Sequence, residues 1–428
     1  MKSEHVHTTA SPTIGLLSRI LLVGAVVFHL TILVSWRHGF LNPLFFDATI
    51  THGTRGWDFF ALYQAGHNFL QGDSVYQSDG DKIDVVVPHY TPFRYLPVSA
   101  YTIGVALNLL SPWNAFRLWV AFTEALLLFC VYLTWKLVPD RDHFTRLAAM
   151  WLCFTPFYLE LYMGQFSMVQ AALLFTMMFV YLRRGRPCAT FDALWIGSVL
   201  WKQNTGLFLP LMLRLRRFRA LAWLVSLVAL TAIPYFAFFP AGIVAFLGNF
   251  RAVANTYQMG NLGWLQLIFE VLAMVAPGWT PERVVLVQRA FILFFIALSL
   301  ALTFLDRDPD VITHLSLWMT TYFLVFHQIW EHHYVMLLPV LVILYARTRS
   351  RLVLALYALI AFFTPFFFLG WSGPVAAGLM LPWTPVRPAW TGLFYHASKP
   401  LPTLLLYGYL MQRIVRRVRC CKIPSIDV

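Results

Sequence analysis

Residues 14–35 of the chain read IGLLSRILLVGAVVFHLTILVS, an apolar run interrupted near its start by one arginine, Arg19. A helix needs about 20 apolar residues to cross the ~30 Å hydrocarbon core of a bilayer. The run is too long for the core of a signal peptide, and no small-residue cleavage site follows it. We therefore predict a retained, membrane-spanning helix here.

The composition extends this interpretation to the whole chain. Hydrophobic residues make up 59% of the 428 residues and charged residues only 12%, whereas a soluble domain carries about 25% charged residues. So few charges cannot coat a soluble surface, and lipid must cover much of it. The net charge of +13 comes from clusters between apolar runs, which are typical of membrane topology signals and not of a nucleic-acid surface. The five cysteines have no spacing typical of a metal site or a disulfide framework.

Further apolar runs follow along the chain. Those long enough to cross a bilayer are 14–35, 114–137, 166–182, 218–239, 284–305, 312–329, 351–370 and 400–416. Shorter runs that fit only as tilted or broken helices inside a bundle are 144–158, 189–201, 203–214 and 334–346. We predict an all-α, polytopic membrane bundle of about 12 spans, forming one domain over residues 1–428.

Basic residues set the expected orientation. Five turns are rich in them: Lys136/Arg141/Arg146, Arg183/Arg184/Arg186, Arg214/Arg216/Arg217/Arg219, Arg347/Arg349/Arg351 and Arg413/Arg416/Arg417/Arg419/Lys422. The positive-inside rule places all five, and both termini, in the cytoplasm. With this orientation, residues 94–110 and 114–137 cannot both cross the membrane. Because 94–110 is shorter and carries Pro97, we predict a juxtamembrane or re-entrant helix within a long external loop, 36–113.

The external loop contains Asp58, in the sequence Trp57-Asp58-Phe59-Phe60 at the start of an amphipathic helix. A carboxylate there can simply cap the free N–H groups of the first turn. The alternative is a carboxylate held at the membrane surface as a general base. The residues alone leave both interpretations open.

Three other polar groups are expected on the same face: Gln165, Lys202 and the pair His332-His333. Lys202 lies between two short apolar runs, where an ionisable group either faces a cavity or snorkels to the interface. The histidines belong to the cluster 327–333, which lacks the i, i+4 histidine pair of a zinc protease. A base, an amide and cations would therefore meet in one external cavity, and we predict no metal.

Two acidic stretches are given a structural interpretation. Asp79, Asp81 and Asp84 lack the spacing of a calcium loop and predict a solvated turn. Residues 306–310, Asp-Arg-Asp-Pro-Asp, are similar to an acidic sugar-nucleotide motif. The topology places them in the cytoplasm, away from the long loop, as a tight turn.

The order of several short motifs resembles one family over nearly the whole chain. These motifs are Tyr63-x-Ala65-Gly66, Leu70-x-Gly72-Asp73-x-x-Tyr76, Phe93-x-Tyr95-x-Pro97, Met163-Gly164-Gln165, Gly260-Asn261, Trp330-x-His332-His333-Tyr334 and Leu337-Leu338-Pro339. Together with the Lys202 hairpin they resemble the DUF2029 glycosyltransferases, glycosyltransferase family 87 of the GT-C superfamily. Two departures leave the acceptor open: Gln203-Asn204-Thr205 follows Lys202 where the family often has a proline, and the loop 79–89 matches no family pattern.

The resemblance implies a membrane enzyme that uses a polyprenyl-phosphate sugar, usually mannose, without a cofactor. It implies an active site on the outer face of the plasma membrane, the inner membrane of a bacterium, and a glycolipid or glycan acceptor. Asp58 matches the catalytic aspartate, and His332 is the better match to the functional histidine. Expected substrate-binding residues are Arg94, Tyr95, Gln165, Lys202, Asn261, Trp330 and His333.

The chemistry of such a reaction calls for one carboxylate to take the proton of the acceptor hydroxyl, which predicts inversion at the anomeric carbon. Positive charge would stabilise the departing lipid phosphate. The competing hypothesis is a secondary transporter or a flippase of a lipid-linked sugar, and a lipid-binding scaffold is a third. The absence of an inverted repeat and of an acidic relay in most spans argues against transport.

Overall fold

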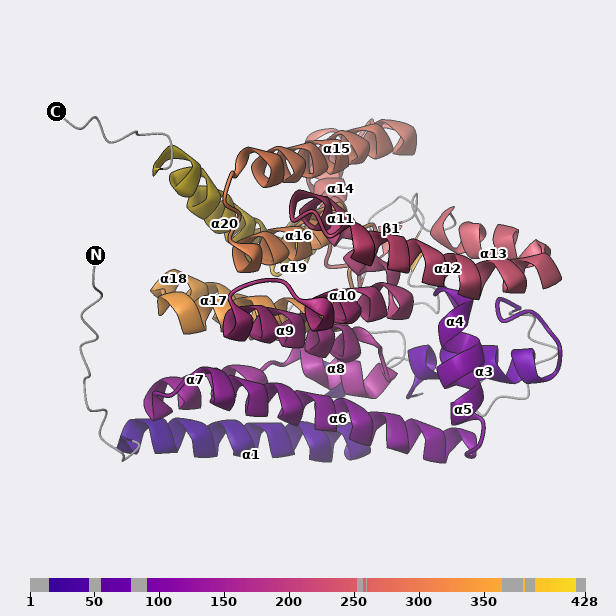
Figure 1. The fold of residues 1–428 in the computed structure, drawn as a ribbon, viewed down its shortest axis with the longest axis horizontal. Helices are drawn as coiled ribbons and strands as arrows, with labels where there is room; N and C mark the ends of the chain where they lie inside the picture. Colours follow the sequence, from indigo (N-terminus) through magenta and orange to yellow (C-terminus); the bar gives the residue numbers. More distant parts are fainter. Residues whose placement is uncertain are drawn as a thin grey trace.

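The computed structural model describes residues 15–45, 55–77, 91–251, 257–258, 260–363, 380–381 and 389–420. Over these residues the chain is almost entirely helical (Figure 1). The exception is strand β1 (Tyr257–Gln258), which pairs antiparallel with β2 (Met380–Leu381). The all-α class that the apolar runs predict is confirmed.

Among the described residues, four helices are long and apolar enough to cross a membrane. They are α1 (Leu16–His38), α6 (Pro112–Leu137), α12 (Phe218–Phe238) and α15 (Pro281–Leu305). Each coincides within a few residues with a predicted run, and α1 and α6 run alongside each other at one edge of the bundle (Figure 1). Many of their side chains face outward, such as Leu293 and Leu230 at 68% and 70% exposure. Lipid is the medium in which such surfaces are stable, so the chain is a membrane protein.

Outside the long loop 36–113, the other helices of the described residues lack the length or the apolarity of a span. They are α7 (Arg141–Leu152), α8 (Pro156–Met163), α9 (Ser167–Arg184), α10 (Ala189–Trp201), α11 (Leu209–Arg214), α13 (Ala241–Arg251), α14 (Trp264–Val275), α16 (Val311–Val325), α17 (Leu338–Thr348), α18 (Arg351–Ala361), α19 (Ala389–Ala397) and α20 (Pro400–Cys420). Short 3-10 turns η1 (Asn42–Leu44), η4 (Gln203–Phe208) and η5 (Glu331–Leu337) lie between them. Two helices are enclosed by the others: every residue of α8 is buried, and in α16 every residue from Val311 to Leu324 is buried.

Three predicted runs are not single helices, and one of them, 203–214, divides between a 3-10 turn and a short α-helix. Residues 144–158 divide between α7, which ends at Leu152, and α8, which begins at Pro156, a residue that is favoured at the first position of a helix. Residues 334–346 begin in η5 before continuing as α17. Within the described residues, four helices combine the length and the apolarity of a span, so the total of about 12 stays a prediction.

The long predicted loop contributes a group of short helices at one end of the bundle. Helix α3 (Trp57–Leu70) packs against the π-helical turn η3 (Ala100–Gly104) and α5 (Val105–Leu107), which continue the chain from α4 (Pro97–Ser99). Figure 1 shows these elements together at its right-hand side, past the end of α10. Gly66 and Gly104 form the closest contact: a Cβ on Gly66 would lie 2.1 Å from the carbonyl carbon of Gly104. The expected helix within 94–110 is therefore packed onto α3.

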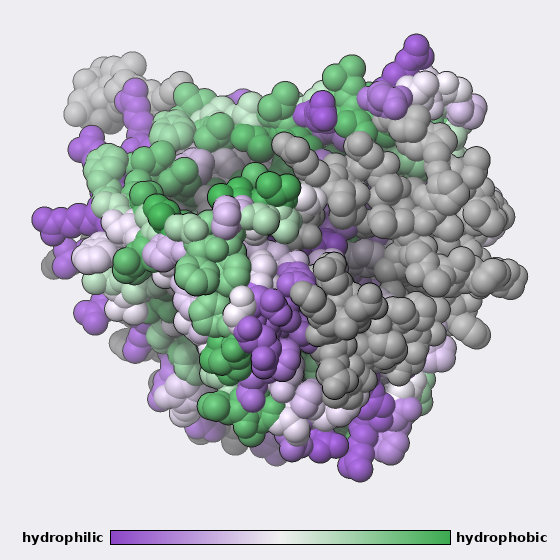
Figure 2. All heavy atoms as spheres, turned by 90° about the vertical axis from the view of Figure 1, so that its right-hand side faces the viewer, coloured by the Kyte–Doolittle hydropathy of each residue, from purple (hydrophilic) through white to green (hydrophobic). Residues whose placement is uncertain are grey.

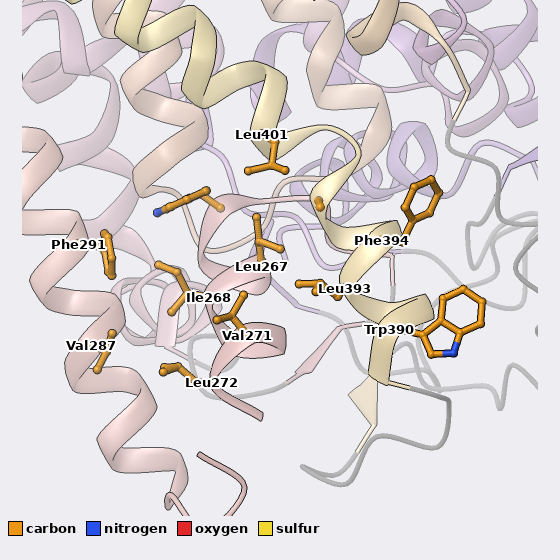
Figure 3. Close-up of a pocket in the computed structure, with 12 residues that line it drawn as sticks. Leu267, Ile268, Val271, Leu272, Val287, Phe291, Trp390, Leu393, Phe394 and Leu401 are labelled. Atoms are coloured by element: carbon orange, nitrogen blue, oxygen red, sulfur yellow. The ribbon is translucent and has the colours of Figure 1, made fainter. Parts of the chain in front are cut away.

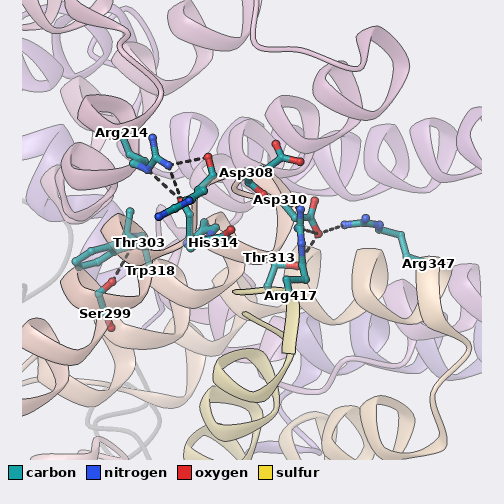
Figure 4. Close-up of polar contacts among 12 residues, drawn as sticks. Arg214, Ser299, Thr303, Asp308, Asp310, Thr313, His314, Trp318, Arg347 and Arg417 are labelled. Carbon is teal, nitrogen blue, oxygen red and sulfur yellow. Dashed lines mark hydrogen bonds and ion pairs between the residues drawn. The ribbon is translucent and has the colours of Figure 1, made fainter. Parts of the chain in front are cut away.

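At the other end of the bundle, the basic turns are tied together through acidic residues. Asp310 lies 2.8 Å from Arg347 and 3.8 Å from Arg417 (Figure 4). Asp140 lies 2.8 Å from Arg349, and Arg217 forms an ion pair with Asp192 at the start of α10. Arg214 donates to the carbonyl oxygen of Asp306 at 2.6 Å. The residues at 306–310 form a short turn here, as expected, and the basic turns share one side of the molecule.

Figure 2 faces the end that carries α3 and shows hydrophilic side chains among hydrophobic ones. This mixture is typical of a surface at the interface between lipid and water. Residues 78–90, which contain Asp79, Asp81 and Asp84, lie outside the described residues.

Candidate active site

Asp58 is the centre of a buried polar cluster. It is the second residue of α3, whose N-cap is Gly56 at φ 80°, and only 8% of its surface is exposed. The Thr91 hydroxyl donates to Oδ1 at 2.6 Å, and Gln165 Nε2 donates to Oδ2 at 3.0 Å. Both partners lie outside α3. The carboxylate therefore does not cap the helix, which was one of the two interpretations that the sequence left open.

Gln165 connects Asp58 to His332. The backbone N–H of Phe166 donates to Gln165 Oε1 at 2.7 Å, which fixes the orientation of the amide. Nε2 then has two hydrogens, one for Asp58 and one for His332 Nε2 at 3.1 Å. Because an amide nitrogen can only donate, His332 Nε2 accepts, and the neutral ring carries its proton on Nδ1. Burial, and next the charge of Lys202, hold the pKa of His332 well below its ordinary value.

His333 has a different role from His332. Its Nδ1 accepts the backbone N–H of Trp330 at 3.0 Å, at the start of η5. The two rings lie 4.3 Å apart between centroids, yet of the two only His332 bonds to Gln165. The prediction that one histidine of the pair faces the Asp58 cavity therefore has a geometric basis.

Two cations lie close to this cluster. Lys202 follows the last residue of α10 and is 7% exposed; its Nζ donates to Ser167 Oγ at 3.3 Å and lies 5.8 Å from the centre of the Tyr95 ring. Arg94 donates from Nη1 to Gln328 Oε1 at 2.7 Å. Burial raises the pKa of Asp58, and the bond from Thr91 and the charges of Lys202 and Arg94 partly offset that rise.

Asn261 supports the loop before η5. Its Nδ2 donates to the carbonyl oxygen of His327 at 2.6 Å, and its Oδ1 accepts from the backbone N–H groups of Gly263 and Ile329, each at 3.0 Å. The side-chain hydrogen bonds described for Asn261 and His333 are thus within segment 261–333, although the charge of Lys202 also acts on His333. Asp58, Gln165, His332, Lys202, Arg94 and Tyr95 are the expected site residues that the structure brings together.

Two members of the cluster were not predicted from the sequence. Thr91 gives no signal of its own, since a threonine in a polar loop is common. Glu160 does give one: it is an acid within the apolar stretch Phe157-Tyr158-Leu159-Glu160-Leu161, and ionisable groups in such stretches usually have a functional or charge partner. It is fully buried on α8.

An apolar cavity lies among the helices that follow the Asn261 loop and the helices that pack on them. It measures about 820 Å³ between α14, α15, α19 and α20, and its lining includes Leu267, Ile268, Phe291, Leu393 and Phe394 (Figure 3). Trp264, the first residue of α14, also lines it and is separated from Asn261 only by Leu262 and Gly263. The cavity therefore begins beside the loop that carries η5.

The sequence model of glycosyltransferase family 87 matches residues 89–326. The chain belongs to this family. The match includes Arg94, Tyr95, Gln165, Lys202 and Asn261, whereas Asp58, Trp330, His332 and His333 lie outside the matched range. No curated protein matches the chain.

The different contacts of the two histidines give a first prediction. His332→Ala removes the acceptor of Gln165 and frees the amide that orients Asp58, so we expect activity per folded molecule to fall roughly 10-fold or more. His333→Asn keeps an acceptor for the Trp330 N–H and should retain most activity. Activity is measured on protein quantified by size-exclusion chromatography. Equal, mild losses in both variants would contradict the assignment.

Proposed function

We propose that this family 87 glycosyltransferase moves a hexose from a polyprenyl-phosphate donor to a hydroxyl of a lipid- or glycan-linked acceptor, with inversion and with Asp58 as general base. The family resemblance makes mannose the first sugar to test. The observation that carries the proposal is a buried carboxylate, hydrogen-bonded from two separate segments, with Lys202 and Arg94 close enough to offset part of the rise in its pKa that burial causes.

The reaction needs one displacement. Asp58 accepts the proton of the acceptor hydroxyl while the oxygen attacks the anomeric carbon from the face opposite the phosphate. The bond from that carbon to the phosphate oxygen breaks, and the phosphate keeps the electron pair. A positioned base of this kind contributes about 10²–10⁴-fold to the rate. A single attack from the opposite face inverts the anomeric configuration.

Positive charge is required where the phosphate leaves. Lys202 and Arg94 supply it in a water-poor site, where fixed charges stabilise a transition state more strongly than in water. Gln165 and His332 hold the base in place. The same arrangement favours a transferase over the competing transporter or flippase. A transferase needs a base for the acceptor's proton and cations for the departing phosphate, whereas transport breaks no covalent bond.

The apolar cavity supports a lipid-linked donor. Its volume of about 820 Å³ and its lining of Leu, Ile, Val, Phe and Trp side chains suit part of an isoprenoid chain (Figure 3). Its start beside Asn261 would leave the phosphate near η5. We place the site on the outer face of the plasma membrane with both termini in the cytoplasm, since the basic turns gather at the end opposite α3.

The proposal is tested with purified protein in lipid nanodiscs and two kinds of donor. A polyprenyl-phosphate hexose should be consumed with formation of a new glycolipid, detected by mass spectrometry, and NMR should show the inverted anomer. GDP-mannose and UDP-glucose should not be turned over, with or without a divalent metal. Direct use of a nucleotide sugar, or retention at the anomeric carbon, would refute the proposed donor or mechanism.

A further inference from the structure

Glu160 has no role in the reaction as proposed, yet it lies beside the cation that the reaction uses. Its side chain is fully buried, on α8. Oε1 accepts the backbone N–H of Met168 at 2.6 Å, while Oε2 has no hydrogen-bond partner in the described part of the chain. Met168 follows Ser167, the residue to which Lys202 donates. The carboxylate thus approaches the first turn of α9 from α8, and the ammonium group approaches it from the extended residue between α10 and η4.

The hydrogen bonding of Lys202 does not by itself account for a buried charge. Its Nζ has one described hydrogen bond, to the neutral Ser167 hydroxyl at 3.3 Å. An ammonium group with this environment loses its proton readily unless negative charge is close. Asp58 is one such charge, but it gives up that role when it takes the acceptor's proton. Glu160 is the second: burial raises its pKa, so it carries its charge towards the alkaline side, where Lys202 would otherwise lose its proton.

We propose that Glu160 is a positioning residue that keeps Lys202 charged for the donor phosphate. The inference rests on the proposed function, because it assigns the phosphate of the donor to Lys202. Burial lowers the pKa of Lys202, and the charges of Glu160 and then Asp58 oppose that change. Other titratable or charged groups around the amine are Arg94, Tyr95, His332 and His333. The two histidines are neutral, so the carboxylates set the charge of Lys202.

A simpler role for Glu160 would be to cap α9, and the variant Glu160→Gln separates the two. Glutamine keeps the carbonyl oxygen that accepts from the Met168 N–H but loses the negative charge. Capping would be retained, whereas Lys202 would lose its proton at a lower pH. The donor phosphate needs the charged amine, so binding is lost when the pH rises far enough to deprotonate Lys202. In Glu160→Gln this loss should occur at a pH lower by at least about one unit than in the wild type.

The experiment measures binding of a polyprenyl phosphate without sugar, between pH 6 and pH 10, to the full chain in nanodiscs. Wild type and Glu160→Gln are compared with Glu270→Gln, another buried glutamate, which lies 3.0 Å from His396. We expect the alkaline limit of binding to move only in Glu160→Gln. The same shift should disappear in a Lys202→Arg background, because arginine stays charged over this range.

The outcomes separate this inference from the proposed function. Unchanged alkaline limits in all variants, with polyprenyl phosphate still bound, would overturn the role of Glu160 and leave the donor assignment standing. Failure of the wild type to bind polyprenyl phosphate at any pH would refute both the donor assignment and the inference that rests on it. A shift of equal size in Glu270→Gln would show a general effect of buried charge and also overturn the inference.

Discussion

Asp58→Asn should lower the rate of transfer at least ~10²-fold, because an amide cannot accept the proton of the acceptor hydroxyl. The substitution keeps the size of the side chain and an oxygen that can accept from Thr91. Rates are measured with a polyprenyl-phosphate hexose at saturating acceptor. A variant that kept more than about a tenth of the wild-type rate would show that Asp58 is not the base.

The pH profile provides a second readout of the same residue. Burial raises the pKa of Asp58, and the base works only when it is ionised. Activity should therefore fall as the pH falls through this raised pKa, above the range of an exposed aspartate. Asp73→Asn, which neutralises a carboxylate just past the end of α3, is the matched control and should keep both the rate and the acid limb.

Gly66→Ala should disrupt the fold around α3. The new Cβ would lie 2.1 Å from the carbonyl carbon of Gly104, 2.4 Å from its oxygen and 2.6 Å from the nitrogen of Val105. All three are backbone atoms, so no side chain can rotate away, and η3 must separate from α3. We expect a cost at or above the ~1–3 kcal/mol of a typical overpacked site.

The measurement for Gly66→Ala is the thermal stability and the monodisperse yield of protein in detergent, together with activity. Gly24→Ala is the matched control, since a Cβ at Gly24 meets nothing within 4 Å and alanine favours the helix α1. Stability equal to that of the wild type in Gly66→Ala would mean that the α3 and η3 backbones are not in contact.

Long helices are the part of this fold that the sequence predicts best. Residues 284–305 and α15 nearly coincide, because a long apolar run leaves a helix as the stable way to satisfy its backbone in lipid. Short runs carry less information. Their lengths do not distinguish a tilted span from a helix enclosed by others, and the predicted run 144–158 is divided at Pro156. Run 351–370 is described only in part, with α18 ending at Ala361.

The candidate site could be predicted in part for a different reason. The charge-based topology placed Asp58, Gln165, Lys202 and His332 on one face, and three of them form a hydrogen-bonded chain. Topology predicts on which side of the membrane a residue lies, but not which other residues it contacts. It could not show that Asn261 uses its amide on the backbone of the neighbouring loop. Nor could it show that Thr91 reaches Asp58, since that contact depends on how the loop folds.

The amide of Gln165 limits how this chain can evolve. Both of its hydrogens and its oxygen are committed, to Asp58, to His332 and to the backbone of Phe166. A glutamate at position 165 would have no hydrogen to offer and would set two carboxylates against each other, and a shorter asparagine could not reach both partners. Positions 58, 165 and 332, far apart in the sequence, are therefore constrained as one unit, and a neutral drift at any of them requires a matching change at another.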